Sequence, residues 1–151
     1  MPGPFYVGDD DSCGTGPLVA PNNVMLGNDT LGDRGGEFVF RQPVHRFEIA
    51  QIIEAAGRNP VNAYGCDGNQ RWTESLVRQW WQQRRGIEAA LRAERDRQIR
   101  LGTDKDYVLF CALERYHRFV IDELRSYLRV YLYFLTEGRC PAEGEALPDL
   151  S

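Results

Sequence analysis

Hydrophobic residues recur at helical spacing through the second half of the chain. Between residues 103 and 137 they return every three or four positions and spread well beyond one face, and between 73 and 101 they form a sparser stripe. Gly102 and Gly138 follow these two stretches, and glycine is the usual residue just beyond a helix end. Because only a few residues connect the stretches, the pattern predicts a long antiparallel helical hairpin over residues 73–137.

A shorter helix is predicted upstream of the hairpin, over residues 44–57. Phe47, Ala50, Ile53 and Ala56 recur at helical spacing and mark its apolar face, and Gly57 provides a stop. The residues between this helix and the hairpin are rich in Asn, Gly and Asp, so a loop is expected there.

The first 43 residues have a different character. Residues 1–36 hold 8 of the 15 Gly and 4 of the 8 Pro, and short apolar pieces lie between turn signals. Residues 37–40 form the best strand candidate, which Pro43 ends. We expect an irregular arm with minor β-strand over residues 1–43, and a loose tail over residues 139–151.

These elements together predict an α+β fold that is mostly α. The chain has 151 residues, which is a common length for one domain, so a single domain is expected over 1–151. No apolar stretch reaches the length of a membrane-spanning helix, and the first residues show no targeting signal. We therefore expect a cytoplasmic protein without membrane association.

The last predicted helix carries more apolar surface than one neighbouring helix can cover. This surplus apolar surface either packs into the core of the same chain or forms a contact surface. Such a contact surface would bind another protein or a second copy. For the second interpretation, we place the surface at Tyr127, Tyr131, Phe134 and Leu135, with Trp81 as an aromatic anchor. The sequence shows no catalytic motif, so it favours a non-enzymatic protein–protein interaction module, such as an adaptor, assembly factor or neutralising protein.

The basic residues suggest a source and an alternative function. Arg outnumbers Lys by 17 to 1, a bias typical of GC-rich bacterial or phage genomes, although the net charge is −4. Residues 69–101 are the only basic segment, with eight Arg against four acidic residues. The alternative is nucleic-acid binding through this segment, for which the candidate residues are Arg78, Arg85, Arg95 and Arg97.

Charge spacing in the same segment speaks against nucleic-acid binding. Acidic and basic residues alternate every four positions, which predicts a ladder of side-chain ion pairs along an exposed helix. Its members are Arg84, Glu88, Arg92, Asp96 and Arg100. A ladder of this kind neutralises its own field, so we expect a solvated helix face rather than a phosphate-binding surface.

A small enzyme is the third hypothesis. Cys66 lies in a Gly-Cys-Asp-Gly loop, but the adjacent Asp67 disfavours the thiolate that a nucleophile needs. Cys13, Cys66 and Cys140 with one His would form a zinc site only if distant loops met. Nothing in the spacing requires that, so no metal and no cofactor are expected.

Overall fold

The protein is mostly helical, with a few short strands in two small sheets. The computed structural model describes residues 1–9, 14–28, 31, 35–102 and 107–151. Its helices are α1 (Gly16–Val19), α2 (Arg46–Arg58), α3 (Glu74–Gln82), α4 (Arg84–Leu101), α5 (Tyr107–Arg118) and α6 (Leu124–Glu137), with a 3-10 turn at Gly68–Gln70 and a π-helical segment at Phe119–Glu123. Its strands are β1 (Tyr6–Val7), β2 (Val24–Leu26), β3 (Glu37–Val39) and β4 (Tyr64–Gly65). The predicted fold class, mostly α with minor β-strand, is confirmed at this level.

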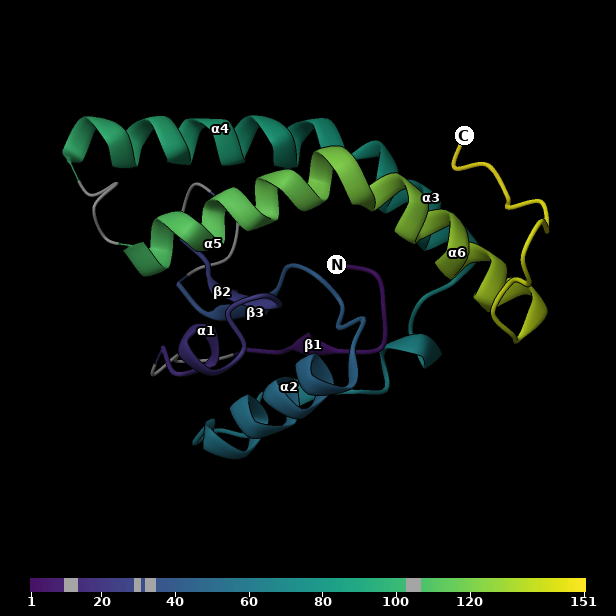
Figure 1. Ribbon diagram of the computed structural model, residues 1–151, viewed down its shortest axis with the longest axis horizontal. Helices are drawn as coiled ribbons and strands as arrows, with labels where there is room; N and C mark the ends of the chain where they lie inside the picture. The colour runs from purple at the N-terminus through teal and green to yellow at the C-terminus, as the bar shows by residue number, and fades with distance from the viewer. Residues whose placement is uncertain (10–13, 29–30, 32–34, 103–106) are drawn as a thin grey trace.

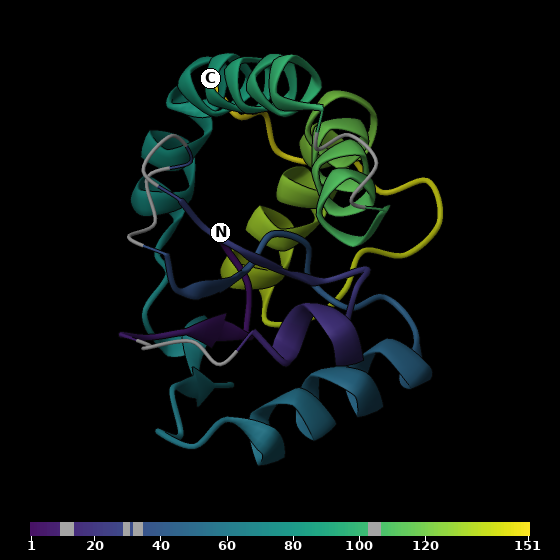
Figure 2. The same ribbon diagram turned by 90° about the vertical axis from the view of Figure 1, so that its left-hand side faces the viewer.

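The elements are arranged in layers. Helices α3 to α6 lie on one side of the molecule, where α4 contacts α5 and α3 contacts α6 (Figure 1). The chain runs along α3 and α4 and returns along α5 and α6, and the connecting residues 103–106 lie outside the described residues. The antiparallel sheets β1–β4 and β2–β3 lie next to this layer, and α2 lies on their far side (Figure 2). One face of α2 therefore points away from the rest of the protein.

Each of the two predicted long helices is interrupted. Gln83 ends α3 and begins α4. Next to this break, the Arg84 guanidinium donates a hydrogen bond to the Trp81 carbonyl at 3.1 Å. It also lies 3.9 Å from the centre of the Trp81 ring. The π-helical segment interrupts the second helix, between α5 and α6. The predicted ends of the two long helical stretches are confirmed, because Gly102 and Gly138 both adopt left-handed backbone at φ 67°. The predicted stop at Gly57 is wrong, because α2 continues through it to Arg58 and Asn59 is its C-cap.

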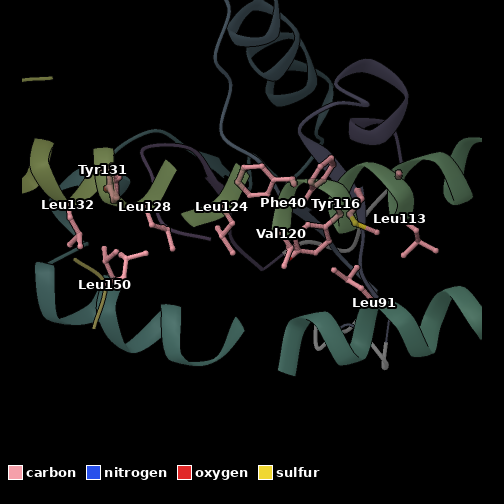
Figure 3. Packing of buried hydrophobic residues seen from close by; sticks show 14 residues of the cluster. Phe40, Leu91, Leu113, Tyr116, Val120, Leu124, Leu128, Tyr131, Leu132 and Leu150 are labelled. Atoms are coloured by element: carbon pink, nitrogen blue, oxygen red, sulfur yellow. The ribbon is translucent and has the colours of Figure 1, made fainter. Parts of the chain in front are cut away.

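The main hydrophobic core lies against the long helical layer. Its largest contribution comes from α5, the π-helical segment and α6, and Figure 3 shows their side chains meeting Phe40, Leu91 and Leu150. The helical members are Ala112, Leu113, Tyr116, Phe119, Val120, Leu124, Leu128, Tyr131 and Leu132. The surplus apolar surface predicted for the last helix is thus largely covered within the chain.

The tail that follows α6 is extended but not loose, which corrects the prediction. Leu150 is 1% exposed and joins the main core beside α6 (Figure 3). Arg129 on α6 donates to the Leu147 carbonyl at 2.7 Å, and Arg78 on α3 donates to the Ser151 carbonyl at 2.8 Å. The short sequence of the tail gave no periodic signal, yet one buried leucine and two arginines hold it against both helices.

Glu145 gives the turn at the start of this tail a dependence on pH. Arg139 holds the pKa of the Glu145 carboxyl down to about 2, helped by hydrogen bonds from the Ala142 N–H and the Tyr133 hydroxyl. A carboxyl with a lowered pKa stabilises the fold above its unfolded pKa of about 4.3, and this contribution is lost as the pH falls towards 2. We expect thermal melts of the wild type and of Glu145→Gln to differ at pH 6 and to converge by about pH 2. A constant difference across this range would contradict the assignment.

Candidate protein-binding surface

The tyrosine-rich face of α6 is part of the core. Tyr131 is 6% exposed, its hydroxyl donates to Asn69 Oδ1 at 2.9 Å, and burial raises the pKa of Tyr131 to about 12. The Tyr127 hydroxyl donates to the Pro2 carbonyl at 3.0 Å, and burial raises the pKa of Tyr127 as well. These rings face the start of the chain and the loop before α3. The prediction of an outward contact surface centred on Tyr131 is therefore corrected.

The other members of the predicted surface belong to the same cluster. Tyr127, Phe134, Leu135 and Trp81 are partly buried and pack against the main core. Tyr131 stacks between Tyr127, at 6.0 Å between ring centres, and Phe134, at 6.3 Å. The structure thus brings the five predicted side chains to the main core, with Tyr131 inside it and the other four packed against it.

An apolar stripe is exposed elsewhere, on α2. Phe47 is 55% exposed and Ile53 61% exposed, and Ile49 and Ala50 are exposed beside them. These four residues, which we call the α2 stripe, are all on the solvent-exposed part of the helix. Phe47, Ala50 and Ile53 follow one another at intervals of three positions, and Ile49 lies four positions before Ile53. The buried residues of the helix are Glu48, Ile52 and Ala55. An apolar stripe on a surface helix usually faces the core, whereas this one faces outward.

Glu48 explains the rotation of α2. Its carboxylate accepts hydrogen bonds from the Val44 N–H at 2.7 Å and from the His45 N–H at 3.3 Å, and it pairs with Arg41 at 2.9 Å. Burial alone would raise the pKa of Glu48, but the hydrogen bonds from Val44 and Arg41 outweigh it and the pKa is lowered. Glu48 is therefore fixed inward, and Ile52 follows it on the same face one turn later. The α2 stripe is left on the opposite side.

A groove of about 440 Å³ lies beside the beginning of α2. The exposed Val44 lines it together with Val130 on α6 and the π-helical residue Phe119. Arg41 lies at its edge and pairs with Glu123 at 3.5 Å in addition to Glu48. Interruptions of the π type occur often at functional sites. This groove extends the apolar exposure of α2 towards the helical layer, and no sequence motif pointed to it.

Most of the arginines proposed for nucleic-acid binding are engaged within the protein. Arg78 pairs with Glu74 at 2.8 Å, Arg95 with Glu114 at 2.6 Å, and Arg97 with the buried Glu94 at 2.6 Å. Arg85 is exposed, with no ion pair to the described residues. These partners neutralise three of the four charges that the nucleic-acid hypothesis needs.

The predicted ladder of ion pairs along α4 is wrong in its pairing. Among the residues described in this helix, no ion pair joins consecutive ladder members, and Arg84 instead covers the Trp81 ring. The ion pairs that form on α4 use Arg95 and Arg97, which lie outside the ladder. Exposed side chains four positions apart gain little from pairing, so the Trp81 ring competes successfully for Arg84.

Among the described residues, the cysteine and metal candidates are not brought together. Cys66 and Cys140 are free and exposed, whereas Cys13 lies outside the described residues. Within the described ranges, no group of three or more His, Cys, Asp or Glu side chains is placed to hold a metal ion. No helix there combines the length and apolar character needed to cross a bilayer.

Comparisons of the chain with protein-family models, with curated protein sequences and with solved structures return no match.

Proposed function

We propose that this protein is a non-enzymatic protein–protein interaction module that binds through the α2 stripe. The observation that carries the proposal is the outward direction of the stripe, with Phe47 and Ile53 more than half exposed on a well-formed helix. An adaptor, assembly or neutralising role in the cytoplasm of a bacterium, or of a phage-infected cell, fits such a module. The Tyr-rich face of α6 serves this module as its supporting core.

The firm attachment of the buried face of α2 to the rest of the protein supports this role. Ile52 and Ala55 pack into a second, smaller core with Val24 and Val39 of the β2–β3 sheet, and Glu48 fixes the start of the helix. A contact surface on a rigid element loses little conformational entropy when it binds. Charged residues also border the stripe, as Arg46 is exposed and Glu54 pairs with Arg58 at 2.5 Å. An apolar centre with a polar rim is the usual anatomy of a protein interface.

A photo-crosslinking amino acid at position 53 tests the proposal in the cell of origin. The matched control carries the same group at position 92, an exposed arginine on α4. Helices α4 and α2 lie on opposite sides of the molecule (Figure 2). We expect position 53 to form a covalent adduct with a protein, either a second copy or a different chain, and position 92 to form none. Equal adduct yields at the two positions, or no protein adduct at position 53, would contradict the proposal.

A further inference from the structure

The α2 stripe is self-complementary, and we infer that its partner is a second copy of this chain, bound through an antiparallel pair of α2 helices. This inference rests on the proposed function and names the partner of the same surface. Ala50 stands at the middle of the stripe and is exposed. A small residue at the crossing point lets two helix backbones approach closely, and a two-fold axis there makes each contact occur twice.

The apolar contacts follow from the spacing around Ala50. In an antiparallel pair centred on this residue, Phe47, three positions before it, lies opposite the partner's Ile53, three positions after it. The two side chains are 55% and 61% exposed in the single chain, so both lose water contact on pairing. Gly57 leaves open space one turn beyond Ile53, with no atom within 4 Å of where its Cβ would be. No other described part of the chain therefore covers the helix at Gly57.

The charged contacts select the same arrangement. Arg46, four positions before Ala50, lies opposite the partner's Glu54, four positions after it, so two ion pairs flank the apolar centre. Arg46 is exposed, with no ion pair to any described residue, whereas Glu54 already accepts Arg58 and would be shared between two guanidinium groups. A parallel pair would instead set each Arg46 beside its own copy. Charge complementarity thus favours the antiparallel register over the parallel one.

Light scattering coupled to size-exclusion chromatography tests the inference on the purified full chain. At about 100 µM, where a Kd in the micromolar range leaves most chains paired, we expect twice the 17.3 kDa mass of one chain. Arg46→Glu and Glu54→Arg each place like charges together twice, so each variant alone is expected to weaken pairing by about tenfold or more. Circular dichroism verifies that both variants keep the helix content of the wild type.

An equimolar mixture of the two variants is the decisive sample. Glu at position 46 of one chain then meets Arg at position 54 of the other, and Glu54 of the first meets Arg46 of the second, so the mixture is expected to recover the dimer. A mixture that stays monomeric while the wild type is dimeric would overturn the antiparallel arrangement. A monomeric wild type would overturn the inference of a second copy. In that case an adduct at position 53 with a different protein would still support the proposed function.

Discussion

Replacing Tyr131 by alanine is expected to lower the free energy of unfolding by about 3–5 kcal/mol, the usual cost of truncating a large aromatic side chain in a core. Tyr131 is 6% exposed, stacks between Tyr127 and Phe134, and donates a hydrogen bond to Asn69. The substitution removes the ring contacts and leaves the amide oxygen of Asn69 without this donor. Because a domain of this size is stable by about 5–15 kcal/mol, the loss is a large fraction of the total. Urea denaturation followed by circular dichroism measures it.

Val130→Ala is the matched control for this prediction. Val130 is the preceding residue on α6 and is 37% exposed, so its truncation is expected to cost less than about 1 kcal/mol. If Tyr131→Ala instead kept wild-type stability but lost its protein partner, the contact surface would return to the tyrosine-rich face of α6.

Replacing Leu150 by alanine is expected to destabilise the protein by about 2–4 kcal/mol, as for other leucines truncated in a core. Leu150 is 1% exposed although it lies in a segment without regular structure. The hydrogen bonds from Arg78 and Arg129 reach backbone carbonyls of the tail, so the substitution leaves them available while it removes the apolar anchor. The decrease in the free energy of unfolding should therefore be as large as for a core residue. Chemical denaturation measures this decrease.

Leu101→Ala is the matched control, because it is the same leucine-to-alanine truncation at an exposed position. Leu101 ends α4 and is 62% exposed, so the same truncation is expected to change stability by less than about 0.5 kcal/mol. Equal effects of the two substitutions would show that the tail does not contribute to the core in solution.

The helical elements were predictable because their signals are local. Thr73 begins α3 and accepts a hydrogen bond from the Leu76 N–H, and Gly102 and Gly138 end α4 and α6 in left-handed backbone. These caps depend on the chemistry of single residues beside an apolar periodicity.

Length and composition excluded few functions, however, and no motif pointed to the groove beside Val44.

The direction of each apolar face was not predictable in the same way. The stripe of α2 and the stripe of α6 look alike in sequence, but one is exposed and the other is core. Non-local contacts determine which of the two stripes is buried. Arg41 pairs with Glu48 and holds it inward on α2. On α6, the Tyr127 hydroxyl donates a hydrogen bond to Pro2 and the Tyr131 hydroxyl donates one to Asn69. Glu48 at the third position of its helix was the one local signal, since a glutamate there often bonds back to the helix start.

The tail shows a second limit of local patterns. Leu150 has no periodic apolar neighbours, so its burial depends on where α3 and α6 leave space for it. The same holds for Arg78, which was a candidate for nucleic-acid binding and instead holds Glu74 and the Ser151 carbonyl.

Hydroxyl-radical footprinting of Phe47 and Tyr131, read by mass spectrometry, tests the central claim most directly. It is carried out on dilute purified protein and inside the cell of origin. The fold predicts rapid oxidation of Phe47 in the dilute protein, protection of Phe47 in the cell where a partner covers α2, and slow oxidation of Tyr131 in both samples. Tyr131 oxidising as fast as Phe47, or Phe47 oxidising equally fast inside the cell, would contradict the assignment of the α2 stripe as the binding surface.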